Sequence, residues 1–208
     1  MQLELHTERL KLTPLTFEDV DIEVELWTDE RVAQYAGGAV SEQHIRDEMT
    51  SWVRRGGEGG IGAWCVSLRD SNEKIGDAYL LPLPIDVDDW DLDALEPGKM
   101  PEGDIEIGYF LKPAAWGRGY ATEICKRLVD FAFETVGLDE VVASIYEDNE
   151  ASKHVLQKCG LVYAGKIRCY ASEYPVFKMS RDQWTSLERV RSGRQRTPCE
   201  SAWATPDS

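Results

Sequence analysis

Two glycines one residue apart, Gly117 and Gly119, follow a predicted strand and directly precede a predicted helix. Glycine adopts backbone torsions that other residues resist, and it lets main-chain N–H groups approach a ligand closely. The first turn of the helix adds unpaired N–H groups and the positive end of its dipole, and Arg118 can add a charge-assisted contact. This pattern predicts a phosphate cradle. A tight strand-to-helix turn without a ligand remains the alternative, because short glycine patterns occur often by chance.

The nucleotide-binding motifs that share such glycines do not fit. A Walker A loop would end in Lys followed by Ser or Thr, which this segment lacks. A dinucleotide fingerprint would need a third glycine at Thr122 and would follow the first strand of the fold. The phosphate predicted here therefore belongs to another kind of ligand.

The composition of the chain limits the classes of ligand and partner. The chain of 208 residues has a formal net charge of −15, which repels nucleic acid and anionic membranes and attracts a cationic amine. The five cysteines are widely spaced and the three histidines share no metal-ligand spacing, so we predict neither a disulfide framework nor a metal site. No basic start followed by an apolar run opens the sequence, and no apolar stretch is long enough to cross a membrane. We expect a cytoplasmic protein.

Periodicity and turn signals predict a single mixed α/β domain over residues 1–191, with a polar, flexible tail over 192–208. A capping box of Thr16 and Asp19 opens the first helix. The acidic segment 84–103 is predicted to be a loop, either a solvated excursion or an attractant for a cationic acceptor. The predicted strands are 3–13, 61–69, 74–83, 104–112, 139–146, 161–170 and 173–180, and the predicted helices are 16–27, 41–53, 120–136, 149–160 and 181–191.

Several segments, in chain order, resemble the GNAT N-acetyltransferase superfamily. The loop Trp116-Gly-Arg-Gly-Tyr-Ala-Thr-Glu123 resembles its pyrophosphate-binding loop, although Trp116 stands where Gln or Arg is usual. That departure, the strand at 105–111, the helix at 149–161 and the opening at 7–19 are similar to the RimJ/RimL-like branch. The resemblance spans residues 5–180, and several ordered motifs are far more specific than one.

The resemblance implies a GNAT-type domain with a mixed central sheet of about seven strands flanked by helices. It implies acetyl-CoA as cosubstrate, with its pantetheine arm pairing with a strand in the manner of β-augmentation. A main-chain N–H of that strand would face the thioester oxygen as charge develops on it. Tyr109, Phe110 and Leu111 would line the arm. Gly117, Arg118, Gly119, Tyr120, Ala121 and Thr122 would hold the pyrophosphate, with Asn149 and Ser152 as further cofactor-binding residues.

The resemblance also implies catalytic roles. Glu106 is the expected general base for the attacking amine, directly or through a water, although a structural or substrate-orienting carboxylate is the alternative. Ser152 is expected to hydrogen-bond or protonate the departing thiolate, since Leu156 stands where some members carry a tyrosine acid. Asn149 is equally explained as a helix N-cap. Ala164 stands where the branch often has a glutamate, so its mechanism does not transfer directly.

The sequence thus predicts an acetyl-CoA-dependent N-acetyltransferase that acts by direct attack in a ternary complex. The acceptor is a protein N-terminus or a small-molecule amine, and the sequence does not choose between them. A homodimer is a working expectation with no residue pattern behind it. The alternative is a non-catalytic acyl-CoA-binding regulatory module, which would keep the glycine loop without a base or an acid.

Overall fold

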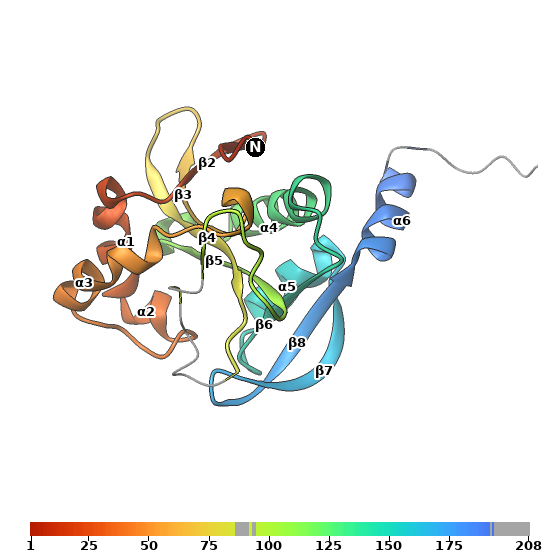
Figure 1. Cartoon of the computed structure of the whole chain (residues 1–208). Coiled ribbons are helices and arrows are strands. Elements are labelled where there is room, and N and C mark those ends of the chain that lie inside the picture. Colours follow the sequence, from red (N-terminus) through yellow and green to blue (C-terminus); the bar gives the residue numbers. More distant parts are fainter. Residues whose placement is uncertain (86–91, 93–94, 192, 194–208) are drawn as a thin grey trace, which may run out of the picture.

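An eight-stranded sheet in the order β1-β2-β3-β4-β5-β6-β8-β7 forms the centre of the molecule (Figure 1). Its computed structural model describes residues 1–85, 92, 95–191 and 193. Neighbouring strands are antiparallel except β5 and β6, which are parallel. The predicted single α/β domain with a mixed sheet is confirmed, with one strand more than expected. The strands are β1 Leu5–His6, β2 Leu10–Pro14, β3 Gly62–Leu68, β4 Lys74–Pro82, β5 Ile105–Leu111, β6 Glu140–Ser144, β7 Val162–Cys169 and β8 Ser172–Ser180.

The extra strand arises because the predicted strand 3–13 folds back on itself. β1 and β2 pair antiparallel, with Leu5 opposite Leu12. The Thr7 main-chain N–H donates to the Leu10 carbonyl at 3.0 Å, and the Thr7 hydroxyl accepts from the Leu10 N–H at 2.9 Å. The threonine that looked like a strand residue therefore closes the turn, while the flanking leucines enter the core.

The helices before β3 cover one face of the sheet. They are α1 Val20–Trp27, preceded by a 3₁₀ turn at Phe17–Asp19, α2 Glu30–Ala33 and α3 Glu42–Trp52. The predicted capping box is confirmed, since the Thr16 N–H and hydroxyl both donate to Asp19 Oδ2 at 2.9 Å. The short α2 was not predicted, because four residues carry too little periodicity.

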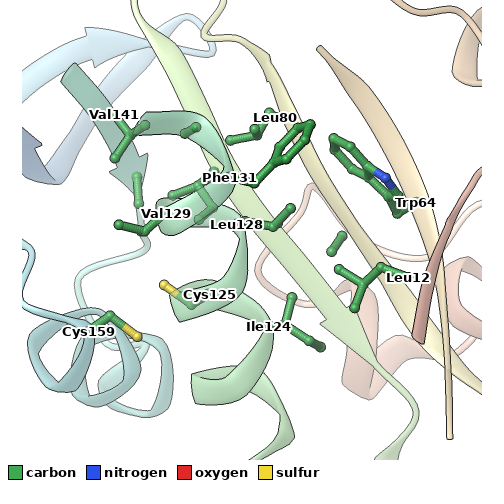
Figure 2. Packing of buried hydrophobic residues seen from close by; sticks show 14 of the residues in the cluster. Leu12, Trp64, Leu80, Ile124, Cys125, Leu128, Val129, Phe131, Val141 and Cys159 are labelled. Carbon is green, nitrogen blue, oxygen red and sulfur yellow. The ribbon is translucent and has the colours of Figure 1, made fainter. Parts of the chain in front are cut away.

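The later helices cover the opposite face. α4 Tyr120–Phe131 continues through a π-helical turn, Ala132–Val136, and ends at Gly137 in the left-handed region, as predicted. α5 is Glu150–Cys159 and α6 is Arg181–Arg191. Trp64 of β3 meets Phe131 of α4 edge to face with ring centroids 5.7 Å apart, and Figure 2 shows this contact within the main core. Residues of β3 alternate between the two faces, since Trp64 and Val66 enter the α4 cluster whereas Cys65 enters the α1 cluster.

The segment between β4 and β5 is only partly described. Leu92 and Leu95 are buried in the main core. Most of the acidic side chains predicted to form a loop here lie outside the described residues, as does the tail from 194 onward. Within the described part of the chain, no helix is long and apolar enough to cross a membrane.

Candidate active site

The sheet opens between β5 and β6. β5 pairs with β4 along seven positions, from Gly76–Leu111 to Pro82–Ile105, but its ladder with β6 holds one pair, Glu106 with Val142. Main-chain groups alternate along a strand, and Lys112 N–H and the Asp104 carbonyl both bond to the β4 side. The odd-numbered residues of β5 therefore turn their main-chain groups toward β6. Beyond the single pair, Tyr109 faces a gap that an extended ligand can enter as an added strand.

The glycine loop lies at the end of this gap. Gly117 has φ +71° and Gly119, the N-cap of α4, has φ +80°, so both occupy the left-handed region that the sequence analysis required. A Cβ at Gly117 would meet nothing within 4 Å. The loop residues from Trp116 to Gly119 are exposed, and the N–H groups of the first turn of α4 are placed to receive a phosphate.

Arg9 fastens this loop to the N-terminal strands, a role that sequence analysis missed. Its guanidinium donates to Glu123 of α4 at 2.8 Å and to the Arg118 carbonyl at 3.0 Å, and it lies 4.6 Å from the centre of the Tyr120 ring. Thr7 also donates to Glu123. Partial burial alone would raise the pKa of Glu123, but the hydrogen bonds from Thr7 and Arg9 lower it below its usual value. Only the separation of these segments in the sequence hid the contact.

Trp116, which stands where Gln or Arg is usual in this kind of loop, has a structural role. Its indole N–H donates to the Leu111 carbonyl at 2.7 Å, which ties the glycine loop to the end of β5. The loop is thus held from two sides, by Arg9 and by Trp116. Leu111, which was expected to line the pantetheine arm, already uses its carbonyl in this contact.

Tyr109 and Ser152 meet on the α5 side of the gap. Their hydroxyl oxygens are 3.1 Å apart, and Asn149, the N-cap of α5, accepts from the Ser152 N–H at 3.0 Å. Burial raises the pKa of Tyr109 well above its usual value, so this phenol stays protonated and can donate. The structure therefore brings together three of the predicted residues, Tyr109, Asn149 and Ser152.

Glu106 lies on the other face of β5. It is 2% exposed, and its carboxylate accepts from the Ser144 main-chain N–H at 3.0 Å, from the Ser144 hydroxyl and from the Tyr170 hydroxyl. Burial raises the pKa of Glu106, and the hydrogen bonds from Ser144 and Tyr170 offset only part of that rise. The structure does not bring Glu106 and Ser152 together, because they occupy opposite faces of the sheet.

Tyr79 closes the space between Glu106 and Phe110. A Cβ at Gly108 would stand 2.0 Å from the Tyr79 ring, so glycine is the residue that lets this ring cross β5. The phenol also interacts with Tyr170 and Glu106, and burial raises its pKa. Sequence analysis missed Ser144, Tyr170 and Tyr79, because a serine at a strand end and tyrosines in strands carry no spacing signal.

Two further buried carboxyl side chains, Asp77 and Glu23, lie farther along the same face. Asp77 accepts from the Phe110 main-chain N–H at 3.1 Å, and the Trp27 indole donates to Glu23 at 3.0 Å. Burial raises the pKa of Asp77 to about 7, and burial together with the Asp77 charge raises that of Glu23. Both shifts favour retention of a proton by the pair. The Phe110 ring packs on Trp27 with centroids 4.7 Å apart, and its main-chain N–H is bonded on the β4 side, so Phe110 does not face the gap that it was expected to line.

The chain matches the family model described as an acetyltransferase (GNAT) domain over residues 9–162. It is a GNAT acetyltransferase. The match covers the glycine loop, both faces of β5 and all of α5. Members of this family use acetyl-CoA as cosubstrate.

Relatives and solved structures agree with the family. The protein named FsC-acetyl coenzyme A-N(2)-transacetylase from Aspergillus fumigatus is 26% identical over 217 residues, covering 97% of this chain and 87% of its own length. An uncharacterized N-acetyltransferase of Bacillus subtilis, YoaA, is 28% identical over 169 residues, covering 80% of this chain and 86% of its own. The crystal structure of an acetyltransferase from Agrobacterium tumefaciens superposes with a TM-score of 0.69 at 24% identity, over 86% of this chain and 95% of that one.

This GNAT acetyltransferase is therefore an N-acetyltransferase, and the predicted enzyme class and acetyl-CoA are confirmed. The RimJ/RimL-like branch stays a prediction. Among the described residues, no group of three or more His, Cys, Asp or Glu side chains is placed to hold a metal ion.

Proposed function

We propose that this enzyme transfers the acetyl group directly from acetyl-CoA to an amine while both are bound. The observation that supports this most strongly is the position of Glu106, which belongs to the single residue pair in the backbone ladder between β5 and β6. A thioester lying in the gap just beyond would have the Tyr109–Ser152 hydroxyls on one face and the Glu106 carboxylate on the other. An acid for the thiolate and a base for the amine would thus approach the reacting carbon from opposite sides.

In the proposed reaction, Glu106 receives the proton that the acceptor ammonium loses before its nitrogen attacks the thioester carbon. Tyr109 and Ser152 supply a proton toward the leaving sulfur. The N–H groups of the glycine loop and the first turn of α4, with Arg118, hold the pyrophosphate, while Tyr109 and the main-chain N–H of Leu111 line the pantetheine arm. Asn149 holds the first turn of α5 so that Ser152 faces Tyr109.

Direct transfer agrees with the burial of the four cysteines in the described part of the chain. Cys65, Cys125, Cys159 and Cys169 are all buried. Burial raises the pKa of Cys65 and Cys169, which removes the thiolate that a covalent acyl-enzyme would need. Cys125 and Cys159 lie with their side chains between α4 and α5, away from solvent (Figure 2).

The acceptor is proposed to be a primary amine, on a protein N-terminus as in the RimJ/RimL-like branch or on a small molecule. The name of the Aspergillus relative specifies transfer to a nitrogen. The net charge of −15 favours a cationic acceptor of either kind. The non-catalytic acyl-CoA-binding module is disfavoured, because it would not need a buried carboxylate beside the thioester.

We further propose that residues 1–191 form the working domain, that it acts as a homodimer and that it is cytoplasmic. Light scattering on the 1–191 fragment and the full chain tests the first two points. A folded dimer of both supports them, and a monomer or an insoluble fragment contradicts them.

The deciding experiment follows thiol release from acetyl-CoA with a panel of diamines, amino acid amides and peptides with free N-termini, alongside calorimetry with CoA. We expect turnover with one class of amine and intersecting lines when the concentrations of both substrates are varied. Parallel lines would indicate an acyl-enzyme and contradict direct transfer. Binding of CoA without turnover on any amine would instead favour the non-catalytic module.

A further inference from the structure

Glu106 cannot itself touch an acceptor in this structure. Its side chain is 2% exposed, and each carboxylate oxygen is engaged, one by Ser144 and the other by the Tyr170 hydroxyl. If a buried base is to accept a proton from a bound substrate, another group must contact both the base and the substrate. Tyr170 is such a group, because it is half-buried while its hydroxyl donates to Glu106 Oε2.

The backbone that carries Tyr170 is strained. Tyr170 and Ala171 form the two-residue turn between β7 and β8, with φ +50° and +61°. Turns of this kind favour Asn-Gly, and a residue with a Cβ is destabilised by about 1 kcal/mol or more at each left-handed position. The turn is nevertheless held firmly, since Tyr170 N–H donates to the Pro84 carbonyl at 3.1 Å and Ala171 N–H to the Ile85 carbonyl at 3.0 Å. Strain that the surroundings maintain is characteristic of functional positions.

A row of tyrosines leads from Tyr170 toward the N-terminal helices. The ring centroids of Tyr170 and Tyr174 are 6.3 Å apart, those of Tyr174 and Tyr146 5.1 Å, and those of Tyr146 and Tyr35 5.8 Å. All four side chains are half-buried and come from four different segments. Ring faces and phenol oxygens attract an organic ammonium more than they attract a neutral or anionic group. The row therefore forms a wall along which a protonated amine can approach Tyr170.

We propose that Tyr170 is a catalytic residue that carries the proton from the acceptor ammonium to Glu106. This inference rests on the proposed function, because it assumes that Glu106 is the base. It assigns to the tyrosine row the binding of a cationic acceptor.

The proton transfer balances without any other reactant. The Tyr170 oxygen accepts a proton from the acceptor nitrogen as the Tyr170 O–H bond breaks and its proton forms a bond with Glu106 Oε2. Tyr170 ends as a neutral phenol, Glu106 as a neutral acid and the acceptor as a free amine. The nitrogen lone pair then attacks the thioester carbon and the C–S bond breaks. The second proton that the nitrogen loses as the amide forms balances the proton that Tyr109 and Ser152 supply to the sulfur, and Glu106 releases its own proton through Tyr170 to solvent after the product leaves. Tyr170 never has to become a stable phenolate, which its raised pKa would forbid.

The direction of the pH dependence follows from the groups that face Glu106. These are Ser144 from β6, Tyr79 from β4, and Tyr170 with Cys169 from the β7–β8 hairpin. The hydrogen bond from Tyr170 favours the ionised carboxylate and so lowers the pKa of Glu106, against the larger effect of burial. Replacing Tyr170 by Phe removes that donor, and the pKa of Glu106 rises further.

The test compares Tyr170→Phe with a matched control, Tyr163→Phe, whose side chain is 58% exposed on β7. Steady-state rates with the best amine of the panel are measured from pH 6 to 10, and CoA binding is followed by calorimetry. We expect Tyr170→Phe to lower kcat about 100-fold with little change in KM for acetyl-CoA, and to move the acidic limb of the profile to higher pH. Tyr163→Phe should match the wild type.

Three results would overturn the inference. An unchanged kcat and pH profile in Tyr170→Phe would exclude the relay and leave the proposed function standing. A lowered kcat with an unmoved acidic limb would reduce Tyr170 to a packing role. A wild-type enzyme that binds CoA but acetylates no amine would refute the proposed function itself, and the relay with it. Tyr35→Leu completes the set, because an unchanged acceptor KM would exclude the tyrosine row as the acceptor wall.

Discussion

The two faces of β5 carry neighbouring residues of different chemistry. The α5 face presents Tyr109 with Ser152, both neutral hydroxyls, together with main-chain groups at the gap. The α1 face presents Glu106 and, beside Phe110, the carboxylate of Asp77, both buried and both with a raised pKa. The α5 face carries neutral hydroxyls, whereas the α1 face carries carboxyl groups whose pKa values are raised by burial. Binding of the cosubstrate and handling of the proton can therefore be altered separately.

The two faces also differ in their effect on the stability of the folded state. The α5 face satisfies its hydroxyls at little expense, because neutral groups lose little by burial once they are hydrogen-bonded. The α1 face removes carboxylates from water, which destabilises the ionised folded state unless protons are retained. Of the two faces, we expect the α1 face to contribute more to the pH dependence of stability.

The strongest test of this division is Glu106→Gln. The amide keeps the size of the side chain but cannot accept a proton, so kcat should fall about 1,000-fold. CoA binding should stay within about twofold of the wild type, because the proposed cosubstrate contacts come from the other face. Single-turnover rates and calorimetry on the same sample measure the two quantities. A variant that loses CoA affinity in parallel with kcat would show that the faces are not independent.

Glu23→Gln tests the cost of the buried pair. The folded-state pKa values of Glu23 and Asp77 are raised above the ordinary 4.5 and 3.8, so the folded state retains protons that the unfolded state releases. Stability is therefore present at low pH and is lost as the pH rises from about 4 through the folded value of Asp77, about 7. The amide that replaces the Glu23 carboxyl would supply a permanent donor to Asp77 and would carry no charge of its own.

Urea unfolding at pH 5 and pH 8 measures the effect. We expect Glu23→Gln to be about 1–3 kcal/mol more stable than the wild type at pH 8 and to differ little at pH 5. Glu25→Gln, on the same helix but with its side chain 58% exposed, is the control and should change stability by less than about 0.5 kcal/mol at either pH. An equal loss between pH 5 and pH 8 in wild type and Glu23→Gln would contradict retention of a proton by the pair.

Gly119→Ala tests the cosubstrate side with a smaller effect. Alanine at φ +80° is strained by about 1 kcal/mol, so the loop should lose its binding geometry and the Kd for CoA should rise about 5- to 10-fold. Gly137→Ala at the other end of the same helix, with φ +86° and nothing within 4 Å of a Cβ, carries the same strain away from the loop. Calorimetry should show weakened CoA binding in the first variant only. Equal affinities would mean that the left-handed torsion at Gly119 serves the turn and not the ligand.

The cosubstrate side could largely be predicted from the sequence, because its determinants are local. Two glycines, a helix start and an N-cap can each be recognised from a few consecutive residues. The structure shows left-handed torsions at Gly117 and Gly119. The main exception at this loop was Arg9, whose partner Glu123 is 114 residues away. The strand that folded back at Thr7 was also missed, since a turn made by a side-chain hydroxyl leaves the apolar alternation intact.

The acidic side could not be predicted beyond Glu106. Its members come from β4, β6 and the β7–β8 turn, and a single sequence gives no signal for contacts between distant strands. Tyr170 occupies a turn position where Asn or Gly would be expected, and the sequence analysis read it as the end of a strand. A non-glycine pair at such a tight turn was the one clue available, and it becomes informative only when the left-handed torsions are known.

The contact between Arg9 and the glycine loop has a consequence for the order in which the enzyme folds. The loop is tied to strands made at the start of synthesis, so the pyrophosphate site can be completed only after α4 has left the ribosome and found β2. Loop closure over so long a separation is slow and entropically costly. A cosubstrate that binds only the closed arrangement would pull the equilibrium toward it by mass action. In a cell, the supply of acetyl-CoA would then help to determine how much of the newly made chain survives as enzyme.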